Sequence, residues 1–503
     1  MNWDISNLFL SIKRIVFLIS VSIIASPVVF LLLSFFTPIT YEFSSKYSLN
    51  IAFTTLHFIL WVTFFSVIIG TTLAYLLSTF IFPGSKVFSI LLFLPFCLPP
   101  YVMAFTQLGF WDGYLGRNST LEAAFIMSLC LYPYVFIFTK AAFTSQGKRL
   151  IEVAQSFQWS PFKCFLKVSL PLAWPWITGA SLFVIMESLS DFGLVSILNV
   201  NTVSVSIYKA WFSYFSIETA LRIAQITIFI VLCLLYLEHK IREKRRFYQM
   251  NFIKNEKILL NGTRSLLAFI FCLSIFSISF IIPCFQLVYW NLDTFNFSLV
   301  LSLIPEITNT IIIASILSVV ALMFALLVLL TLRFETQYKK MFNGLLSFAS
   351  IGYAIPGAVL AVLSYSVLHN FRFLNQSVSL VIIGLLTRFF MVGLNPIKNG
   401  LNRLSGSIDN AARSLGCTSF QLSYKVLLPN ISVACLVAVL FLFVETVKEM
   451  PITLMTRPFG WDTLSVKVFE FTSEGEWNLA SIPALLITCI SLLPVYFISK
   501  KVV

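Results

Sequence analysis

The stretch DNAARSLGCTSFQLSYKVLLP, residues 409–429, has a copy elsewhere in the same chain. A shift of 258 residues, the separation of Pro171 and Pro429, aligns it with IEVAQSFQWSPFKCFLKVSLP at residues 151–171. The identical residues include Ala154/Ala412, Ser156/Ser414, Phe162/Phe420, Lys167/Lys425, Leu170/Leu428 and Pro171/Pro429. The spacing, about half of the 503-residue chain, indicates a protein made of two related halves.

Long apolar runs surround both copies. Apolar residues make up 58% of the chain and charged residues only 11%, and the mean hydropathy is +0.92. A helix needs about 20 mostly apolar residues to cross a bilayer, and about twelve runs reach that length. They lie near 15–36, 52–78, 87–108, 121–143, 174–198, 220–238, 265–289, 309–331, 341–368, 377–397, 431–450 and 480–499. The first is too long to favour a removed signal peptide. The sequence therefore predicts an all-α integral membrane protein with two six-helix repeats.

Lysine and arginine residues concentrate in every second connection between the runs. Because cytoplasmic loops carry the excess of Lys and Arg, we expect both termini and both copies of the repeated segment to be cytoplasmic. The copies then run in the same direction, which makes the repeat parallel. The strongly basic connection at 239–264 is interpreted as a linker. It separates a first half at 1–238 from a second half at 265–503.

Several function classes lack their motifs. No G-x-x-x-x-G-K-[ST] phosphate loop occurs, so any ATP that drives the protein is expected on another chain. The nine cysteines and three histidines form no CxxC or HExxH pattern, so the sequence predicts no zinc site and no cofactor. Which residues, if any, bind a metal is left open by the sequence. The formal charge of +13 lies in short loops between apolar runs, so lipid headgroups explain it better than nucleic acid.

The repeated segments read as a helix, a turn and a second helix on the positively charged side. Each begins with residues that suit a helix start, Glu152 in the first copy and Asp409-Asn410 in the second. A polar turn follows, and the second helix is expected to end at the Leu-Pro pair because proline interrupts helices. Such an element can dock a soluble partner. An amphipathic interface helix is the alternative, but it does not account for an internal copy at matching positions.

The segments resemble the EAA loop of binding-protein-dependent ABC importers, which has E-A-A, then Gly, then Leu-Pro. The second copy carries Asn410, Ala411, Ala412, Gly416, Leu428 and Pro429, with Asp409 just before. The first carries Glu152, Ala154, Leu170 and Pro171 but has Gln158 at the turn. The resemblance implies a type I ABC importer permease in a bacterial inner membrane. It also implies two copies of a cytoplasmic ABC ATPase held by these coupling loops, and a periplasmic solute-binding protein.

Further stretches resemble the permeases of ferric-iron importers. They are LPFCLPPYVMAF (94–105), MESLSDFGLVSIL (186–198), IGYAIPGAVL (351–360) and VKEMPITLMTRPFGWDTLSVKVFE (447–470). The resemblance implies uptake of ferric iron by alternating access, with ATP hydrolysis on partner chains. Thiamine permeases share the fused architecture and remain an alternative, as does a secondary transporter. A membrane enzyme is disfavoured because no catalytic constellation is present.

Four carboxylates occupy matching places near the outer ends of two runs. Glu187 and Asp191 are four residues apart, as are Glu445 and Glu449 in the second half, so each pair shares one helix face. Carboxylates within a membrane rarely face lipid, and their oxygens suit hard cations. We therefore consider these four residues, with Lys448, as candidates for the translocation pathway. Neutralisation of Glu445 or Glu449 by Lys448 is the alternative interpretation.

Overall fold

The computed structural model describes residues 2–34, 45–111, 120–145, 159–243, 257–294, 297–335, 337–349, 351–368 and 377–502. Within these ranges almost every element is a helix, as predicted. The exception is a parallel pair of two-residue strands, β1 (Phe80–Ile81) and β2 (Ile258–Leu259). Among the described residues, eight helices are long and apolar enough to cross a membrane, and three further helix pairs pass the same test with a bend at a short break. The helix α11 (Ile217–Glu243) covers the remaining predicted span near 220–238.

Packing divides the chain into two compact units. The first consists of Met1–Glu42, Phe215–Gln225 and Phe297–Lys467, and the second of Phe43–Tyr214, Ile226–Asn296 and Val468–Val503. Each unit is therefore assembled from segments that are distant in the sequence. The helices α11 and α26 (Leu464–Ser473) contribute residues to both.

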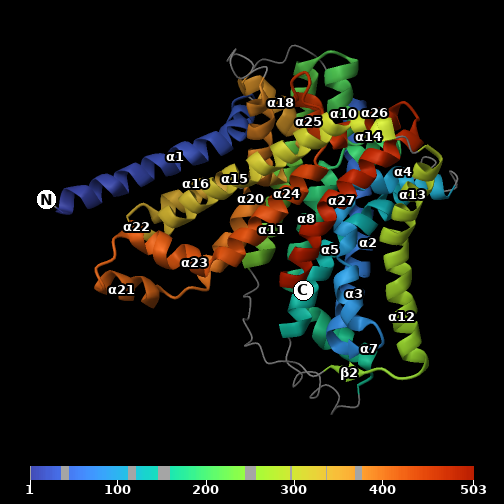
Figure 1. Ribbon diagram of the computed structural model, residues 1–503, viewed down its shortest axis with the longest axis horizontal. Coiled ribbons are helices and arrows are strands. Elements are labelled where there is room, and N and C mark those ends of the chain that lie inside the picture. Colours follow the sequence, from blue (N-terminus) through green and yellow to red (C-terminus); the bar gives the residue numbers. More distant parts are fainter. Residues whose placement is uncertain are drawn as a thin grey trace. The chain divides into compact units, whose positions relative to one another are not determined.

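The first unit is built around α15 (Ile304–Phe334), α20 (Val378–Asn402) and α24 (Ser432–Lys448), which pack against one another. The long N-terminal helix α1 packs along α15, α18 and α20 (Figure 1). The other helices of this unit are α1 (Asn2–Ser34), α14 (Phe297–Ser302), α16 (Lys339–Ala349), α17 (Ile351–Ala354), α18 (Gly357–Leu368), α21 (Gly406–Ser414), α22 (Ser419–Gln421), the π-helical η5 (Leu422–Leu427), α23 (Leu428–Asn430) and α25 (Pro451–Thr456).

The second unit repeats this arrangement around α2 (Ser45–Thr79), α5 (Thr120–Ser145) and α8 (Leu170–Ser190). Its other helices are α3 (Ser85–Leu91), the 3₁₀-helical η1 (Leu94–Cys97), α4 (Pro100–Phe110), α7 (Pro161–Cys164), the π-helical η2 (Phe165–Ser169), α9 (Gly193–Ile197), α10 (Val203–Tyr208), the π-helical η3 (Lys209–Ser213), α12 (Thr263–Phe276), the π-helical η4 (Ser277–Ile281), α13 (Ile282–Thr294) and α27 (Trp477–Val502). The strands β1 and β2 also belong to it.

Each compact unit combines helices from both halves of the sequence. The first unit combines α1, near the N-terminus, with α15, α20 and α24 from the second part of the chain. The second unit combines α2, α5 and α8 with α12, α13 and α27, which follow the basic linker. The halves at 1–238 and 265–503 thus correspond to the sequence repeat. The two packing units do not follow this division, because each contains helices from both halves. The linker prediction at 239–264 falls partly outside the described residues.

Two predicted spans are broken by proline rather than straight. The predicted span at 87–108 consists of Ser85–Cys97 and Pro100–Phe110, bent by 98°. The predicted span at 341–368 consists of Lys339–Ala354 and Gly357–Leu368, bent by 117°. In both cases the break holds an X-Pro step, which disfavours helical geometry in the preceding residue. Leu98 and Pro99 accordingly have extended backbone angles. The prediction of uninterrupted helices was wrong at these two places, which match between the halves.

The second break is closely packed at Gly357, the first residue of α18. A Cβ atom on this glycine would lie 2.4 Å from Nη1 of Arg388 and 2.9 Å from Cγ of Pro451. It would also lie 3.3 Å from Oε1 of Glu449. Glycine is therefore required for α18 to start against α20 and α25, and a buried arginine and a buried glutamate both lie at this contact.

We predict that Gly357→Ala destabilises the protein by about 1–3 kcal/mol, the usual cost of overpacking. The matched control is Gly344→Ala on α16, where a Cβ atom meets nothing within 4 Å. Alanine there is expected to be neutral or stabilising because it favours helix. Thermal unfolding of the detergent-purified variants measures both. Equal stability of the two variants would contradict the close packing at Gly357.

Candidate functional site

The second coupling loop has the predicted helix at its start. Asp409, Asn410, Ala411 and Ala412 all lie in α21, with Asp409 in the first turn. An acidic residue there is favoured by the positive end of the helix dipole. Ala412 is the buried residue of this helix, whereas Asn410 and Ala411 are exposed. The segment is therefore a short helix that presents most of its side chains outward.

The turn after α21 depends on Gly416, which has a φ of 81°. The Gly416 N–H donates to the carbonyl of Arg413 (2.9 Å), and the Cys417 N–H donates to that of Ala412 (3.1 Å). This is a Schellman motif, in which a left-handed residue after the helix satisfies its last carbonyls. The turn that the resemblance assigns to glycine is thus present in the second loop.

A reciprocal cap starts the next helix. The Gln421 N–H donates to Oγ1 of Thr418 (3.2 Å), and the Thr418 N–H donates to Oε1 of Gln421 (3.0 Å), which forms a capping box. The π-helical η5 follows, and then α23, which contains Leu428 and Pro429. The bend of 72° into α24 occurs at Ile431, two residues after the proline. The second helix therefore ends slightly later than predicted.

The first coupling loop lies partly outside the described residues, which exclude Glu152, Ala154 and Gln158. From Phe162 onward the chain forms one unbroken helix to Ser190, which contains Leu170 and Pro171. The prediction that Leu-Pro ends the helix was wrong here. Pro171 lies two residues after the π-helical η2, where the usual hydrogen-bond ladder is already interrupted, so a residue without an N–H is tolerated. The second loop has a π-helical segment at the matching place, η5.

Large apolar side chains are exposed on the second loop. The side chain of Leu415 is 86% exposed, and those of Phe420 and Tyr424 are 59% and 52% exposed. Phe162, the counterpart of Phe420 in the repeat, is 70% exposed. Exposed apolar groups gathered on one short segment are typical of interaction surfaces. The sequence analysis assigned no role to these side chains, although Phe162 and Phe420 lie at matching positions of the repeat.

An arginine that the sequence analysis did not single out holds the start of this loop. Nε and Nη2 of Arg333, at the end of α15, donate to the two carboxylate oxygens of Asp409 at 2.9 and 3.1 Å. Nη1 and Nη2 also donate to the carbonyls of Leu401 (2.8 Å) and Leu404 (3.2 Å). A single guanidinium therefore connects α15, the end of α20 and α21.

A second bidentate pair lies next to the end of α15. Arg14 on α1 donates to both carboxylate oxygens of Glu335, at 2.7 and 3.0 Å. The hydrogen bond from Arg14 holds the pKa of Glu335 below its ordinary value, although burial acts in the opposite direction. A depressed carboxyl pKa stabilises the fold above the unfolded-state pKa. That stability is lost as the pH falls through the folded-state pKa.

Asp191 and Glu449, predicted from the repeat, act as matching helix caps. Oδ2 of Asp191 accepts a hydrogen bond from the Val195 N–H at 3.1 Å, at the start of α9. The carboxylate of Glu449 accepts from the N–H groups of Ile452 (2.8 Å) and Thr453 (3.2 Å), at the start of α25. The predicted span at 174–198 accordingly ends at Ser190, because Asp191 leaves the helix to cap the next one.

Two further pairs of hydrogen bonds repeat around these caps. The Val203 N–H donates to Oγ1 of Thr55 (3.1 Å), and the Leu464 N–H donates to Oγ1 of Thr310 (2.9 Å). Ser204 donates to the carbonyl of Leu189, and Ser465 donates to that of Glu449. The stretches that contain these donors, TVSVSIY at 202–208 and TLSVKVF at 463–469, are similar in sequence. The sequence analysis did not single out the acceptors, Thr55 and Thr310.

The remaining pathway candidates lie beside the caps. Nζ of Lys448 is 3.5 Å from Oε1 of Glu445, as the alternative interpretation proposed. Glu449 is 95% buried and lies with Arg388 against Gly357, while Glu187 is partly exposed on α8. Arg388 was not singled out, although a lone arginine inside an apolar run is a signal of function or pairing. Among the described residues, no group of three or more His, Cys, Asp or Glu side chains is placed to hold a metal ion.

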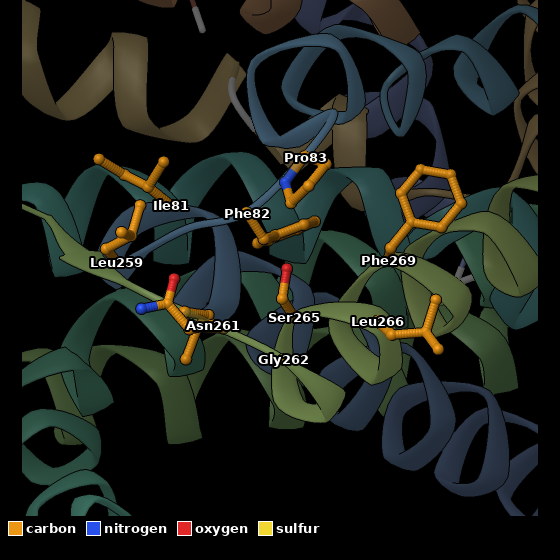
Figure 2. A pocket seen from close by; sticks show the side chains of 10 residues that line it. Ile81, Phe82, Pro83, Leu259, Asn261, Gly262, Ser265, Leu266 and Phe269 are labelled. Carbon is orange, nitrogen blue, oxygen red and sulfur yellow. The ribbon is translucent and has the colours of Figure 1, made fainter.

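The second unit also has an apolar groove of about 700 Å³ beside the two strands. Figure 2 shows Ile81, Phe82 and Pro83 on one side, and Leu266 and Phe269 on α12. Among the residues that the structure describes, Asn261 and Ser265 are its polar side chains and no charged residue lines it. This lining offers no carboxylate to a metal cation and includes none of the candidate pathway residues.

Residues 328–500 match the family model of the binding-protein-dependent transport system inner membrane component. They include α20, the second coupling loop, Arg333 and the Glu445–Glu449 segment. This part of the chain belongs to that family. The resemblance to ABC importer permeases is thereby confirmed for this part of the chain, which matches a family of transport permeases.

Curated relatives agree with this family. The permease is 27% identical over 457 residues to the Fe(3+)-transport system permease protein FbpB 2 of Haemophilus influenzae, a match covering 87% of each chain. It is 32% identical over 96 residues to the putative 2-aminoethylphosphonate transport system permease protein PhnV of Salmonella typhimurium. That match covers 19% of the permease and 36% of the relative.

We predict that Gly416→Ala destabilises the turn after α21 by about 1–2 kcal/mol, the cost of a left-handed conformation for an L-residue. A Cβ atom there meets nothing within 4 Å, so the effect arises from the backbone alone. Amide hydrogen exchange of α21 is the measurement, and faster exchange is expected. Gly406→Ala, also in open space but without positive φ, is the control. Equal exchange in both variants would contradict the requirement for positive φ.

Proposed function

We propose that the permease imports ferric iron, which a periplasmic binding protein delivers and two cytoplasmic ABC ATPase subunits drive across the membrane. The observation that carries the cargo assignment is the match to an Fe(3+)-transport permease along 87% of both chains. The similarity to the phosphonate permease is higher in identity but confined to 96 residues. Similarity along the whole chain includes the regions that line a pathway, so it supports iron more strongly than the shorter match does.

The two coupling loops support a partner on each half. The second loop has the Schellman turn, the capping box and three exposed apolar side chains at its surface. The first loop shares the following π-helical segment and the exposed Phe162. Two similar docking elements suit two copies of one ATPase. The excess of Lys and Arg on the side of these loops supports a cytoplasmic location for them and for both termini.

The mechanism that we propose is alternating access. Closure of the paired ATPases on ATP moves the two coupling loops, and the helices connected to them open the pathway toward the binding protein. ATP hydrolysis reverses the movement and releases the cargo to the cytoplasm. The pathway side chains in this proposal are Glu187, Asp191, Glu445 and Glu449, with Lys448 adjusting the charge of Glu445. Carboxylate oxygens attract a hard trivalent cation.

Asp191 and Glu449 already use carboxylate oxygens to cap short helices. Their proposed contribution is therefore to fix the backbone around the pathway while adding negative charge. Glu187 and Glu445 are the carboxylates placed one helical turn earlier. They are the better candidates for transient contact with the cargo, because both side chains are partly exposed and both lie within their helices.

Reconstitution tests the cargo. The purified permease, its ATPase and its binding protein are placed in liposomes, and uptake of ⁵⁵Fe³⁺ is measured. We expect uptake that requires both ATP and the binding protein. An ATPase variant that binds but does not hydrolyse ATP is the control. Accumulation of thiamine or 2-aminoethylphosphonate without Fe³⁺ would overturn the iron assignment. Uptake without any ATPase would indicate a secondary transporter.

Glu187→Gln tests the pathway assignment. Loss of this negative charge is expected to lower the rate of ⁵⁵Fe³⁺ uptake about tenfold, a loss of about 1.4 kcal/mol in interaction with the cation. ATPase co-purification should stay unchanged because the coupling loops are untouched. Glu474→Gln removes a carboxylate from an exposed turn and serves as the control. If both variants transported like the wild type, Glu187 would not line the pathway.

A further inference from the structure

The guanidinium of Arg333 is the point at which the second coupling loop joins the membrane helices of its unit. It makes two hydrogen bonds to Asp409 on α21 and one each to the carbonyls of Leu401 and Leu404. The carbonyls belong to the end of α20 and the segment just after it, and Arg333 itself belongs to α15. Arg333 therefore connects α15 to two neighbouring segments that lie 68 to 76 residues further along the chain.

This contact is more rigid than an ordinary surface ion pair. The Arg333 and Asp409 side chains are 15% and 17% exposed. A planar guanidinium that binds a carboxylate with two parallel hydrogen bonds fixes orientation as well as distance. The two carbonyl contacts use two of its three remaining donors and oppose rotation. A displacement of α21 must therefore move α15 with it or break the two hydrogen bonds to Asp409.

Helix α21 has few other attachments. It has nine residues, of which Ala412 is the buried one. A helix of this length is marginal in water without tertiary contacts. Asn410, Arg413 and Ser414 are exposed, and Arg413 also lies over the ring of Phe334 at the end of α15, 5.8 Å from its centroid. The Arg333–Asp409 pair supplies the hydrogen bonds that fix α21 relative to α15.

The first half of the chain lacks both members of this pair. The matching hydrogen bonds of Thr55 and Thr310 align α2 with α15, and this alignment places Ser78 where Arg333 stands. Ser78 donates instead to the carbonyl of Tyr75 on its own helix, at 3.1 Å. The repeat of the coupling loops places Ile151 at the position of Asp409, in sequence alone. An ion pair of this kind therefore belongs to the second half.

We propose that Arg333 is a positioning residue that transmits the ATP-driven displacement of α21 to the membrane helix α15. This inference rests on the proposed function, because it assumes that the second coupling loop receives the movement of an ATPase. It adds that the two halves receive that movement through different contacts. The second half uses the rigid Arg333–Asp409 ion pair. Loss of either side chain is therefore expected to uncouple ATP hydrolysis from transport.

The test compares Arg333→Gln and Asp409→Asn with the wild type in the reconstituted complex, measuring Fe³⁺ transported per ATP hydrolysed. We expect this ratio to fall about tenfold, within the usual range of coupling between sites. Affinity for the ATPase should change little, since the exposed side chains of Leu415, Phe420 and Tyr424 are intact. The double variant Arg333→Asp/Asp409→Arg restores the opposite charges and is expected to recover part of the ratio.

Arg14→Gln is the matched control. It also breaks a bidentate arginine–carboxylate pair beside the end of α15, but this pair connects α1 to Glu335 and does not involve α21. Arg333→Gln and Arg14→Gln should both lower thermal stability. Only Arg333→Gln should lower the amount of Fe³⁺ transported per ATP hydrolysed. Equal ratios in the two variants would overturn the inference while leaving the permease function intact. Failure of the wild type to associate with any ATPase would overturn the proposed function and the inference with it.

Discussion

Backbone N–H and C=O groups inside a bilayer must be hydrogen-bonded by the protein itself, because lipid tails supply no partner. Continuous helices meet this requirement along most of the chain. The difficulty arises wherever a helix is interrupted, since each interruption leaves N–H groups without intrahelical partners. Asp191 and Glu449 supply those partners at the two interruptions that follow α8 and α24. Thr55 and Thr310 do the same for the N–H groups of Val203 and Leu464.

The two sets of contacts are related by the internal repeat. Each unit has a cap from an acidic residue, a threonine on the long helix that accepts an N–H, and a serine that donates to a backbone carbonyl. The two units therefore provide hydrogen-bond partners for their backbone groups in a similar way, although most side chains differ between the repeats. This similarity explains why carboxylates occupy matching positions. A capping role accounts for Asp191 and Glu449 independently of any contact with cargo.

The described parts of the two coupling loops are attached differently. The second loop has a glycine turn, a capping box and the arginine joint. In the first loop, a helix continues through Pro171 into the membrane span. It contains a π-helical segment but no sharp bend. A continuous helix transmits displacement along its own axis, whereas a loop held by an ion pair transmits it through side chains. One polypeptide thus presents two unlike connections to what we propose are two identical ATPase subunits.

The sequence alone determined the apolar spans, the repeat and the family, because each depends on residue type and spacing. It also located the glycine turn, since few other residues adopt positive φ. It failed where the outcome depended on residues distant in the chain. Arg333 meets Asp409 across 76 positions. Only the tertiary structure placed Arg388 beside Gly357 and joined helices from both halves of the sequence in each compact unit. Spacing along a chain reports local geometry, whereas these contacts depend on how separate helices pack.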